Sequence, residues 1–377
     1  MRRFAAAYLV ATAALVGVAA GAPKEPEPIS VGLAGPMSGQ FAFVGEQMKH
    51  GAQLAIDDIN AKGGVLGKKL KIAMGDDGCD AQQASTVANQ FVQQKAALVV
   101  GHFCSSASIQ AAAVYAQAGI LQITPASSDP KLTEDAASKG WTNIFSIAGR
   151  ADAQGGVAGD YLASKYKGKK VAIVDDKSPY GKGLAEETRK AMNKKGLKEA
   201  LSEQISQGDK DFSPLIGKLK QGNIAAVYFG GYQAEAGLLV RQAQEQGLKA
   251  QFIAGDALVT DEFWKASGPA GEGVLMTFRS DPRDLPAAKD VIEEFKKQDY
   301  DPAGYTLFTY AAVQVFADAA GQAKSLKLAD LVKALHSHKY ATVVGPITFD
   351  KKGGVLNPDY VLYVWHNGKY EEQKKGS

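Results

Sequence analysis

The feature that most constrains this chain is a repeated alternation between short apolar runs and longer segments with helical periodicity. Four apolar runs of strand length occur early, each followed by such a segment: Ile29–Ala34, Leu70–Met74, Ala97–Val100 and Ile120–Thr124. In Val44–Asn60, for example, apolar residues recur at spacings of three and four, which indicates one buried helix face. The alternation predicts parallel strands joined by right-handed helical crossovers, with helices on both faces of the sheet.

The same alternation starts again further along the chain, which predicts a second doubly wound sheet. The strands expected there are Ile144–Ala148, Lys170–Val174, Ala225–Phe229, Gln251–Ile253 and Val274–Thr277. A late helical block over 287–336 indicates that the chain returns to the first lobe, and strands at 346–349 and 360–366 follow it. We therefore predict an α/β protein of two lobes joined by a multi-strand hinge. Lobe one is expected to comprise residues 29–146 and 279–344, and lobe two residues 147–278 and 345–377.

The N-terminus has the three-part layout of a secretory signal peptide. Arg2 and Arg3 precede an apolar run from Phe4 to Val18, and small residues follow over 19–22. The run is too short and wrongly flanked for a membrane span, so we expect a cleaved signal peptide over residues 1–22. Later stretches do not reach membrane-spanning length, so we expect the exported mature chain not to cross a membrane itself.

The charge balance bears on the class of partner. The formal net charge of +3 falls by two when Arg2 and Arg3 are removed with the signal peptide. Nucleic-acid binding normally requires a clustered basic face, so this balance argues against a nucleic-acid partner. The Lys- and Glu-rich stretch from Lys369 to Lys375 is expected to be a solvated end of the chain.

The chain has two cysteines, Cys79 and Cys104. Two thiols in an exported protein are more often paired than free, so a disulfide is the preferred interpretation. Closing a loop of this length contributes about 3 kcal/mol in the chain-entropy model. The alternative is a metal site that uses His102 with both cysteines, but these three residues lack a recognisable ligand spacing.

Two loops at expected strand ends are rich in hydroxyl groups. Ser105 and Ser106 open an Ala-rich helix, and Thr124–Asp129 follows the next strand. Ligands of open α/β sheets bind beyond the carboxyl ends of the strands, and free N–H groups at a helix start can hold a small carboxylate. A serine in this position can instead simply cap the helix. Taken together, the two loops predict a polar cradle for a carboxylate.

In the second half of the chain, Asp256 follows an expected strand, and Tyr180 and Tyr232 lie in two other loops. An acid that faces a carboxylate cradle would suit a zwitterion, because a buried charge needs an opposite partner. The alternative for Asp256 is a helix cap or an ordinary surface position. The two tyrosines can line a cleft or pack at the lobe surface.

The sequence offers little for catalysis or for a cofactor. Its five histidines occur outside the Gly-x-Ser-x-Gly and His-Glu-x-x-His motifs. His102 lies near Ser105 in sequence without a suitably placed acid, and a buried structural histidine is the preferred interpretation. The loop Gly35–Gly39 lacks the ending of a phosphate-binding loop. We therefore expect no enzymatic activity, no metal and no organic cofactor.

Several loops together resemble a known family. The stretches concerned are Asp57–Gly64, Asp76–Asp80, Gly101–Ser106, Ile123–Ala126 and Tyr228–Tyr232. They are similar to those of the periplasmic branched-chain amino-acid (Leu/Ile/Val) binding proteins, type I periplasmic binding proteins of bacterial ABC uptake systems. The similarity covers nearly the whole mature chain. It implies two α/β lobes, a three-strand hinge and a disulfide corresponding to Cys79–Cys104.

The resemblance also assigns roles to individual residues. The positions that match the family's ligand-binding residues are Ser105, Ala126, Ser127, Ser128, Tyr180, Tyr232 and Asp256. The residues of the first lobe would hold the α-carboxylate, and Asp256 would neutralise the ammonium. This chain departs from the family where Asp256 replaces the usual glutamate. It departs again where Val44, beside Phe43, stands at a position that is often aromatic, so both departures bear on which amino acid is bound.

These observations predict a periplasmic solute-binding protein. A monomer would close around a free branched-chain or related neutral amino acid and pass it to an inner-membrane ABC permease. One alternative is a sensory or scavenging module for another small amide or carboxylate. Another is an exported amidase-type enzyme, which would need a general base within reach of its substrate.

Overall fold

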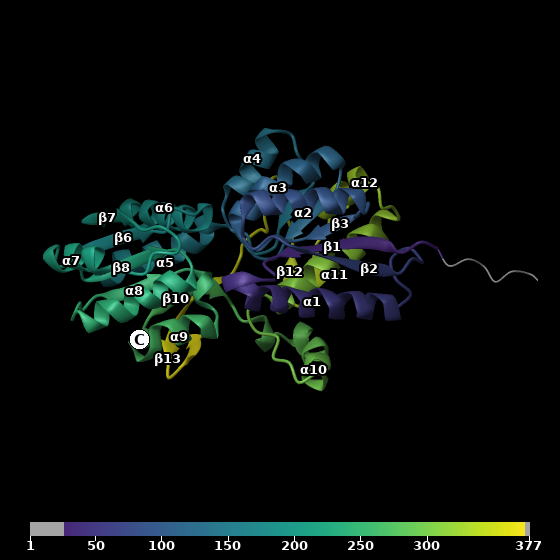
Figure 1. The fold of residues 1–377 in the computed structure, drawn as a ribbon. Coiled ribbons are helices and arrows are strands. Elements are labelled where there is room, and N and C mark those ends of the chain that lie inside the picture. The colour runs from purple at the N-terminus through teal and green to yellow at the C-terminus, as the bar shows by residue number, and fades with distance from the viewer. Residues whose placement is uncertain (1–25, 374–377) are drawn as a thin grey trace, which may run out of the picture.

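Two separate β-sheets, each flanked by helices, form the two halves of the molecule (Figure 1). The computed structural model describes residues 26–373. The predicted signal peptide over 1–22 and the last residues of the tail therefore lie outside the described residues. Within residues 26–373, no helix is long and apolar enough to cross a membrane.

The first sheet is parallel throughout, in the order β2-β1-β3-β4-β5. Its strands are β1 (Ile29–Gly35), β2 (Leu70–Asp76), β3 (Leu98–Val100), β4 (Leu121–Thr124) and β5 (Ile144–Ser146). The helices of this half are α1 (Ala42–Ala61), α2 (Ala81–Gln93), α3 (Ser105–Ala118), α4 (Lys131–Ser138), α11 (Thr306–Ala323) and α12 (Leu328–Ser337). We call this half the first lobe.

Helix α11 packs along α1, although the two are far apart in the sequence. Gly51 makes the close approach possible, since a Cβ there would lie 2.1 Å from the Thr306 carbonyl oxygen. The Tyr310 hydroxyl of α11 also donates to Asp58 of α1 at 2.7 Å. The late part of the chain therefore completes the core of the first lobe.

The second sheet has the order β14-β13-β10-β9-β8-β6-β7. Its strands are β6 (Val171–Asp175), β7 (Leu201–Gln204), β8 (Ala226–Gly230), β9 (Gln251–Ala254), β10 (Leu275–Arg279), β13 (Tyr360–His366) and β14 (Lys369–Glu372). Strand β13 runs antiparallel to both of its neighbours, β10 and β14, and the other pairs are parallel. With helices α5 (Ala151–Lys165), α6 (Pro179–Lys194), α7 (Ser213–Gln221), α8 (Gln233–Glu245) and α9 (Asp261–Ser267), it forms what we call the second lobe.

The remaining elements are small. Helix α10 (Lys289–Lys297) lies beside the first lobe in Figure 1. The strand expected at 346–349 is β12 (Gly345–Ile347), which pairs with β11 (Tyr340–Thr342) in a separate two-stranded sheet. The 3₁₀ turns are η1 (Gly39–Phe41), η2 (Asp256–Leu258), η3 (Gly268–Gly271), η4 (Pro282–Asp284) and η5 (Pro286–Ala288).

Four strands differ from the sequence-based expectation. Strand β11 was not expected, and β14 lies within the Lys369–Lys375 stretch that was expected to be a solvated end of the chain. The strand expected at Ile144–Ala148 as the start of the second sheet is β5, which pairs with β4 at the edge of the first sheet. The alternation of strand and helix continues through both sheets, so it does not mark where one sheet ends. Strand β7 was not expected at all, because its exposed edge residues lack an apolar run.

Three chain segments connect the lobes, and Arg279 contacts all of them. Arg279 lies at the end of β10, where the chain leaves the second sheet. Its guanidinium donates to the carbonyl oxygen of Ile147, in the first connection, at 3.2 Å, and it forms an ion pair with Asp359 in the third. The Tyr360 hydroxyl adds a bond to the Ala148 carbonyl at 3.0 Å. The predicted fold class, two α/β lobes joined by a multi-strand hinge, is confirmed.

Candidate functional site

The first-lobe side of the candidate site is the start of helix α3. The N-terminal neighbour of this helix, Cys104, makes no side-chain capping bond, so the N–H groups of the first turn are not satisfied by a side chain at that position. Ser105 is 1 % exposed, and its Oγ accepts the N–H of Asp129 at 3.3 Å. That bond joins the helix start to the loop that follows β4. Such a helix start can bind an anion.

The loop after β4 contains two serines with different environments. The Ser127 hydroxyl contacts the carbonyl oxygens of His102 at 3.1 Å and Phe103 at 2.9 Å, and the Ser108 hydroxyl at 2.6 Å. It therefore ties the two loops together. The Ser128 Oγ is buried and has no hydrogen-bond partner among residues 26–373. Of the two predicted ligand-binding hydroxyls, Ser128 is the one that remains free to bind a ligand.

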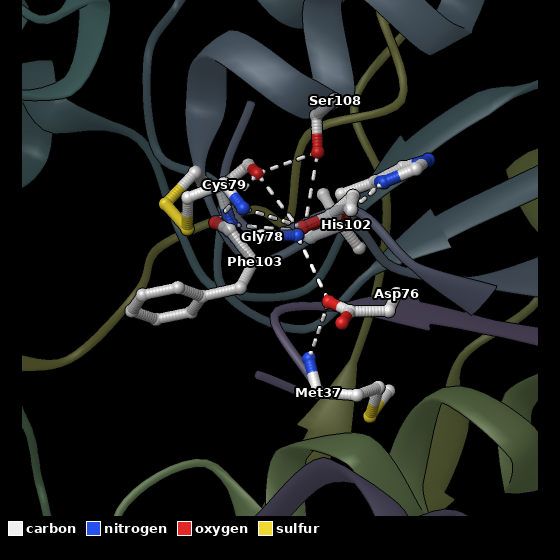
Figure 2. Close-up of a disulfide and its surroundings, with 11 residues drawn as sticks. Met37, Asp76, Gly78, Cys79, His102, Phe103 and Ser108 are labelled. Atoms are coloured by element: carbon white, nitrogen blue, oxygen red, sulfur yellow. Dashed lines mark hydrogen bonds and ion pairs between the residues drawn. A yellow bond between two sulfur atoms is a disulfide. The ribbon is translucent and has the colours of Figure 1, made fainter. Parts of the chain in front are cut away.

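A disulfide and a buried histidine hold the loop in front of α3 (Figure 2). Cys79 and Cys104 are bonded, with their Cα atoms 5.4 Å apart, which confirms the predicted disulfide. His102 Nδ1 lies 2.5 Å from Asp77 Oδ2, and its Nε2 lies 2.9 Å from the Tyr115 hydroxyl. In Figure 2 the disulfide and the Phe103 ring lie on one side of the His102 main chain.

These bonds test two interpretations of the sequence: a metal site at His102 and the two cysteines, and a structural role for His102. Both sulfur atoms are used in the disulfide and both ring nitrogens of His102 have protein partners, so a metal site of these three residues is wrong. His102 is also fully buried, as expected of a structural histidine. The acid that orients it, Asp77, lies 25 residues earlier in the chain. The first-lobe side is therefore a rigid loop whose polar groups largely satisfy one another.

The second-lobe side is centred on Asp256, which begins the turn η2 directly after β9. The side chain is 3 % exposed. Its Oδ1 accepts bonds from Gln154 Nε2 at 3.0 Å and from the Tyr180 hydroxyl at 2.7 Å, and its Oδ2 accepts the Tyr305 hydroxyl at 2.8 Å. Burial raises the pKa of Asp256, and these bonds act in the opposite direction. The three donors are neutral, so they orient the carboxylate without supplying an opposite charge.

Aromatic rings from both lobes meet next to Asp256. The Tyr232 ring, from the second lobe, lies edge-on to Phe41 at 4.9 Å and also contacts Tyr180 at 4.9 Å. The Phe103 ring, from the first lobe, lies 5.2 Å from Tyr305. The Tyr305 hydroxyl, also from the first lobe, reaches Asp256 in the second. Through these contacts, aromatic residues of the two lobes pack against each other beside Asp256.

Four buried acids lie near the Tyr232 ring. Burial raises the pKa of Tyr232 well above its usual value, and the charges of Asp176, Asp256, Asp77 and Asp129 raise it further. Burial also raises the pKa of Asp176 to about 6. A positive group bound beside these acids would stabilise their ionised forms.

The predicted residues thus lie on two facing sides. Ser105 and the 126–128 loop are joined on the first lobe, and Tyr180, Tyr232 and Asp256 lie together on the second. Sequence reasoning missed four contact residues: Phe41, Phe103, Gln154 and Tyr305. Phe41, not Phe43, is the aromatic residue before α1 that reaches Tyr232. Tyr305 directly precedes α11, so the rule that sites lie where loops lead into helices could have found it.

The arrangement can bind both ends of a zwitterion. A helix start and a buried hydroxyl without a partner among residues 26–373 belong to one lobe, and a buried carboxylate belongs to the other. Anions are stabilised at helix N-termini, and a buried carboxylate is stabilised by an ammonium. The aromatic rings between them supply apolar contact area.

Comparison with known proteins supports this interpretation. A family model described as periplasmic binding protein matches residues 28–369. An amino acid binding protein of Pseudomonas aeruginosa is 47 % identical over 348 residues, covering 91 % of this chain and 92 % of the relative. The Leu/Ile/Val-binding protein homolog 1 of Brucella melitensis is 44 % identical over 341 residues, covering 90 % and 91 %.

A solved structure shows the same fold. The branched-chain amino acid transporter substrate binding protein of Streptococcus pneumoniae, in complex with isoleucine, is 26 % identical, with a TM-score of 0.81. The alignment covers 92 % of this chain and 99 % of that protein. From the family match over nearly the whole described chain and these relatives, we conclude that this chain belongs to the periplasmic binding protein family.

Proposed function

We propose that this protein binds a free branched-chain or related neutral amino acid between its two lobes, which close on the ligand by hinge motion. The ligand carboxylate binds at the start of α3, with Ser105, Ser128 and the main chain of Ala126, while Ser127 holds the loop. The ammonium binds Asp256. Tyr180 and Tyr232, with Phe103 and Tyr305, surround the rest of the ligand.

The single observation that carries this proposal is the buried Asp256 carboxylate, whose protein partners are neutral donors from both lobes. An ionised carboxylate is stable in such a place when a cation completes its environment. An α-amino acid supplies that cation together with a carboxylate for the opposite lobe. The names of the relatives, an amino acid binding protein and a Leu/Ile/Val-binding protein homologue, support the same ligand class.

We further propose that the protein acts in the periplasm as the solute-binding component of an ABC transporter. The chain is exported by the signal peptide over 1–22 and works as a monomer without enzymatic activity. The closed form, with lobes over 29–146 plus 279–344 and 147–278 plus 345–377, docks on the inner-membrane permease. Ligand binding biases the hinge, and the permease recognises the closed state.

A thermal-shift screen tests the ligand class. Protein that has been unfolded, freed of ligand and refolded is heated with each common amino acid. A ligand present at one hundred times its dissociation constant should add about 2.7 kcal/mol to the free energy of unfolding. We expect the largest shifts with small and branched neutral amino acids.

Matched analogues of leucine serve as controls in the same screen. 4-Methylpentanoate lacks the ammonium and isoamylamine lacks the carboxylate, so each should shift the melting temperature far less than leucine. Chromatography of the incubated amino acids should show no turnover. A shift with the anion alone, and none with any amino acid, would contradict the proposal.

A further inference from the structure

Gln154, in the first turns of α5, lies directly behind Asp256 in the second lobe. It is fully buried. Its Nε2 donates to Asp256 Oδ1 at 3.0 Å, to the Thr277 carbonyl oxygen at 3.0 Å and to Thr277 Oγ1 at 3.1 Å. One amide group therefore connects the acid of η2 to strand β10, which leads into the hinge.

The surroundings fix which way the amide points. Asp256 Oδ1 and the Thr277 carbonyl oxygen are both acceptors, so the nitrogen and not the oxygen must face them. Gly255 leaves room for this arrangement, because a Cβ there would lie 2.6 Å from the Tyr180 hydroxyl and 3.3 Å from Gln154 Nε2. Both donors can therefore reach the same carboxylate oxygen.

Asp256 depends on such donors for its position. The turn η2 spans three residues, and its N-terminal neighbour Gly255 makes no side-chain capping bond. Tyr180 stabilises the turn by accepting the Ala257 N–H at 3.1 Å while donating to Asp256. Gln154 also donates to the main chain of strand β10. An amide orients the carboxylate without neutralising it, whereas a lysine or arginine would replace the ligand's ammonium.

We propose that Gln154 is a positioning residue for ammonium recognition, which holds the Asp256 carboxylate in the orientation that the bound amino acid requires. The inference rests on the proposed function. The Oε1 atom of Gln154 is buried and has no partner among residues 26–373, so this oxygen can still accept a hydrogen bond.

The test uses Gln154→Glu, which keeps the shape of the side chain but exchanges the donor for a titratable group. At pH 8 the added charge repels Asp256, and L-leucine and L-valine should bind about 100-fold more weakly than to the unmodified protein. As the pH falls to about 5, the introduced carboxylate takes up a proton, because its burial and the charge of Asp256 raise its pKa. The protonated group donates as glutamine does, and affinity should return to within about tenfold.

Gln154→Met is the matched control, because it keeps the volume but cannot donate at any pH. Its affinity should be about tenfold weaker than that of the unmodified protein at both pH values, with no recovery in acid. Isothermal titration calorimetry measures the affinities, and circular dichroism establishes that each variant is folded. A loss from misfolding alone would not recover at low pH, so the pH profile separates the two causes.

Two results would overturn the assignment. One is unchanged affinity in both variants at pH 8; the other is an equal loss in both that does not depend on pH. If the unmodified protein binds no amino acid, the proposed function itself fails. If it binds leucine or valine and the variants behave in either of those ways, only the role of Gln154 fails.

Discussion

The two lobes place different kinds of buried polar group at the candidate site. On the first lobe, Ser127, Thr124 and His102 bond to one another's loops, and the buried acids Asp77 and Asp129 have partners within that lobe. On the second lobe, Asp176 and Asp256 are buried acids whose pKa values burial raises. The first side largely satisfies its polar groups within one lobe, and the second holds buried acids that cost stability when they are ionised.

This difference has a consequence for how substitutions should change ligand affinity and the free energy of unfolding. Neutral hydroxyls that satisfy one another stabilise the fold with or without a ligand. A buried carboxylate with neutral donors destabilises the ligand-free protein and is stabilised when a cation binds. Substitutions on the second side should therefore change affinity and stability in opposite directions, and those on the first side should not.

The largest effect is expected for Asp256→Asn, which removes the buried charge and keeps the shape. Removing one partner of a buried charge pair costs about 2–5 kcal/mol, so affinity for leucine should fall at least about 30-fold. The free energy of unfolding without ligand should rise, because an unpaired buried charge is lost. Calorimetric titration and chemical denaturation measure the two quantities.

Asp129→Asn is the matched control, since Asp129 is a buried acid of the first lobe whose carboxylate already accepts the Lys131 N–H at 2.9 Å. It should change affinity by less than about fivefold. Equal losses of affinity in the two variants would show that Asp256 has no special role, and the contrast between the two lobes would be lost.

Asp176→Asn should give the next effect, on stability. Burial raises the pKa of Asp176 from 3.8 to about 6, and the charge of Glu235 adds to this. The folded protein therefore holds this proton more tightly than the unfolded chain, and the stability of the fold decreases as the pH rises through that interval. At pH 7 the variant should be more stable by up to about 3 kcal/mol.

The amide can retain the native bonds, because Asp176 Oδ1 accepts the Ser178 N–H at 3.0 Å and an Asn oxygen can do the same. Urea denaturation at a series of pH values measures the difference. It should shrink to nearly nothing at about pH 3, where the native acid is protonated in the folded state and largely so in the unfolded chain. A difference that does not vary with pH would rule out ionisation as its cause.

The smallest effects are expected on the first lobe, from a pair of neighbouring serines. Ser128→Ala removes a buried hydroxyl that has no partner among the described residues. It should weaken ligand binding about tenfold and leave the free energy of unfolding nearly unchanged. Ser127→Ala leaves its neighbours' polar groups unpaired, and should lower that free energy by about 1–3 kcal/mol.

Binding and unfolding experiments on both serine variants test the roles given to Ser127 and Ser128. If Ser127→Ala reduces affinity without reducing stability, then Ser127 contacts the ligand and Ser128 does not. The reversed pattern would exchange the roles given to these two residues.

Local sequence patterns predicted much of the fold. Strand β1 and helix α1 follow from apolar runs and helical spacing, and the disulfide follows from two cysteines in an exported chain. Strand β7 could not be found in this way, because an exposed edge strand has no apolar run. The placement of β5 failed because membership of a sheet depends on pairing between strands, which local periodicity does not encode.

A site residue could be predicted only where its residue type, at the end of an expected strand, indicated a chemical role such as charge pairing. Asp256 met that condition, and its assignment to the ammonium stays a prediction. Gln154 and Tyr305, which donate to Asp256, could not be predicted in this way, because they lie 102 and 49 residues away from it in sequence. Periodicity shows that such residues are buried but not which partner they meet. Ser127 and Ser128 show the same limit, because neighbours of one type differ only in their tertiary contacts.

The pairing of α1 with α11 has a consequence for biosynthesis. Strands β6 to β10 lie in one continuous stretch of chain, so the inner sheet of the second lobe can assemble as soon as that stretch emerges. The first lobe begins earlier but must wait for α11, since the Tyr310–Asp58 bond alone spans 252 residues. Contacts of such long range form slowly. The first lobe is therefore begun first but is completed only when α11 has been made, and the second lobe in turn receives β13 and β14 at the end of synthesis.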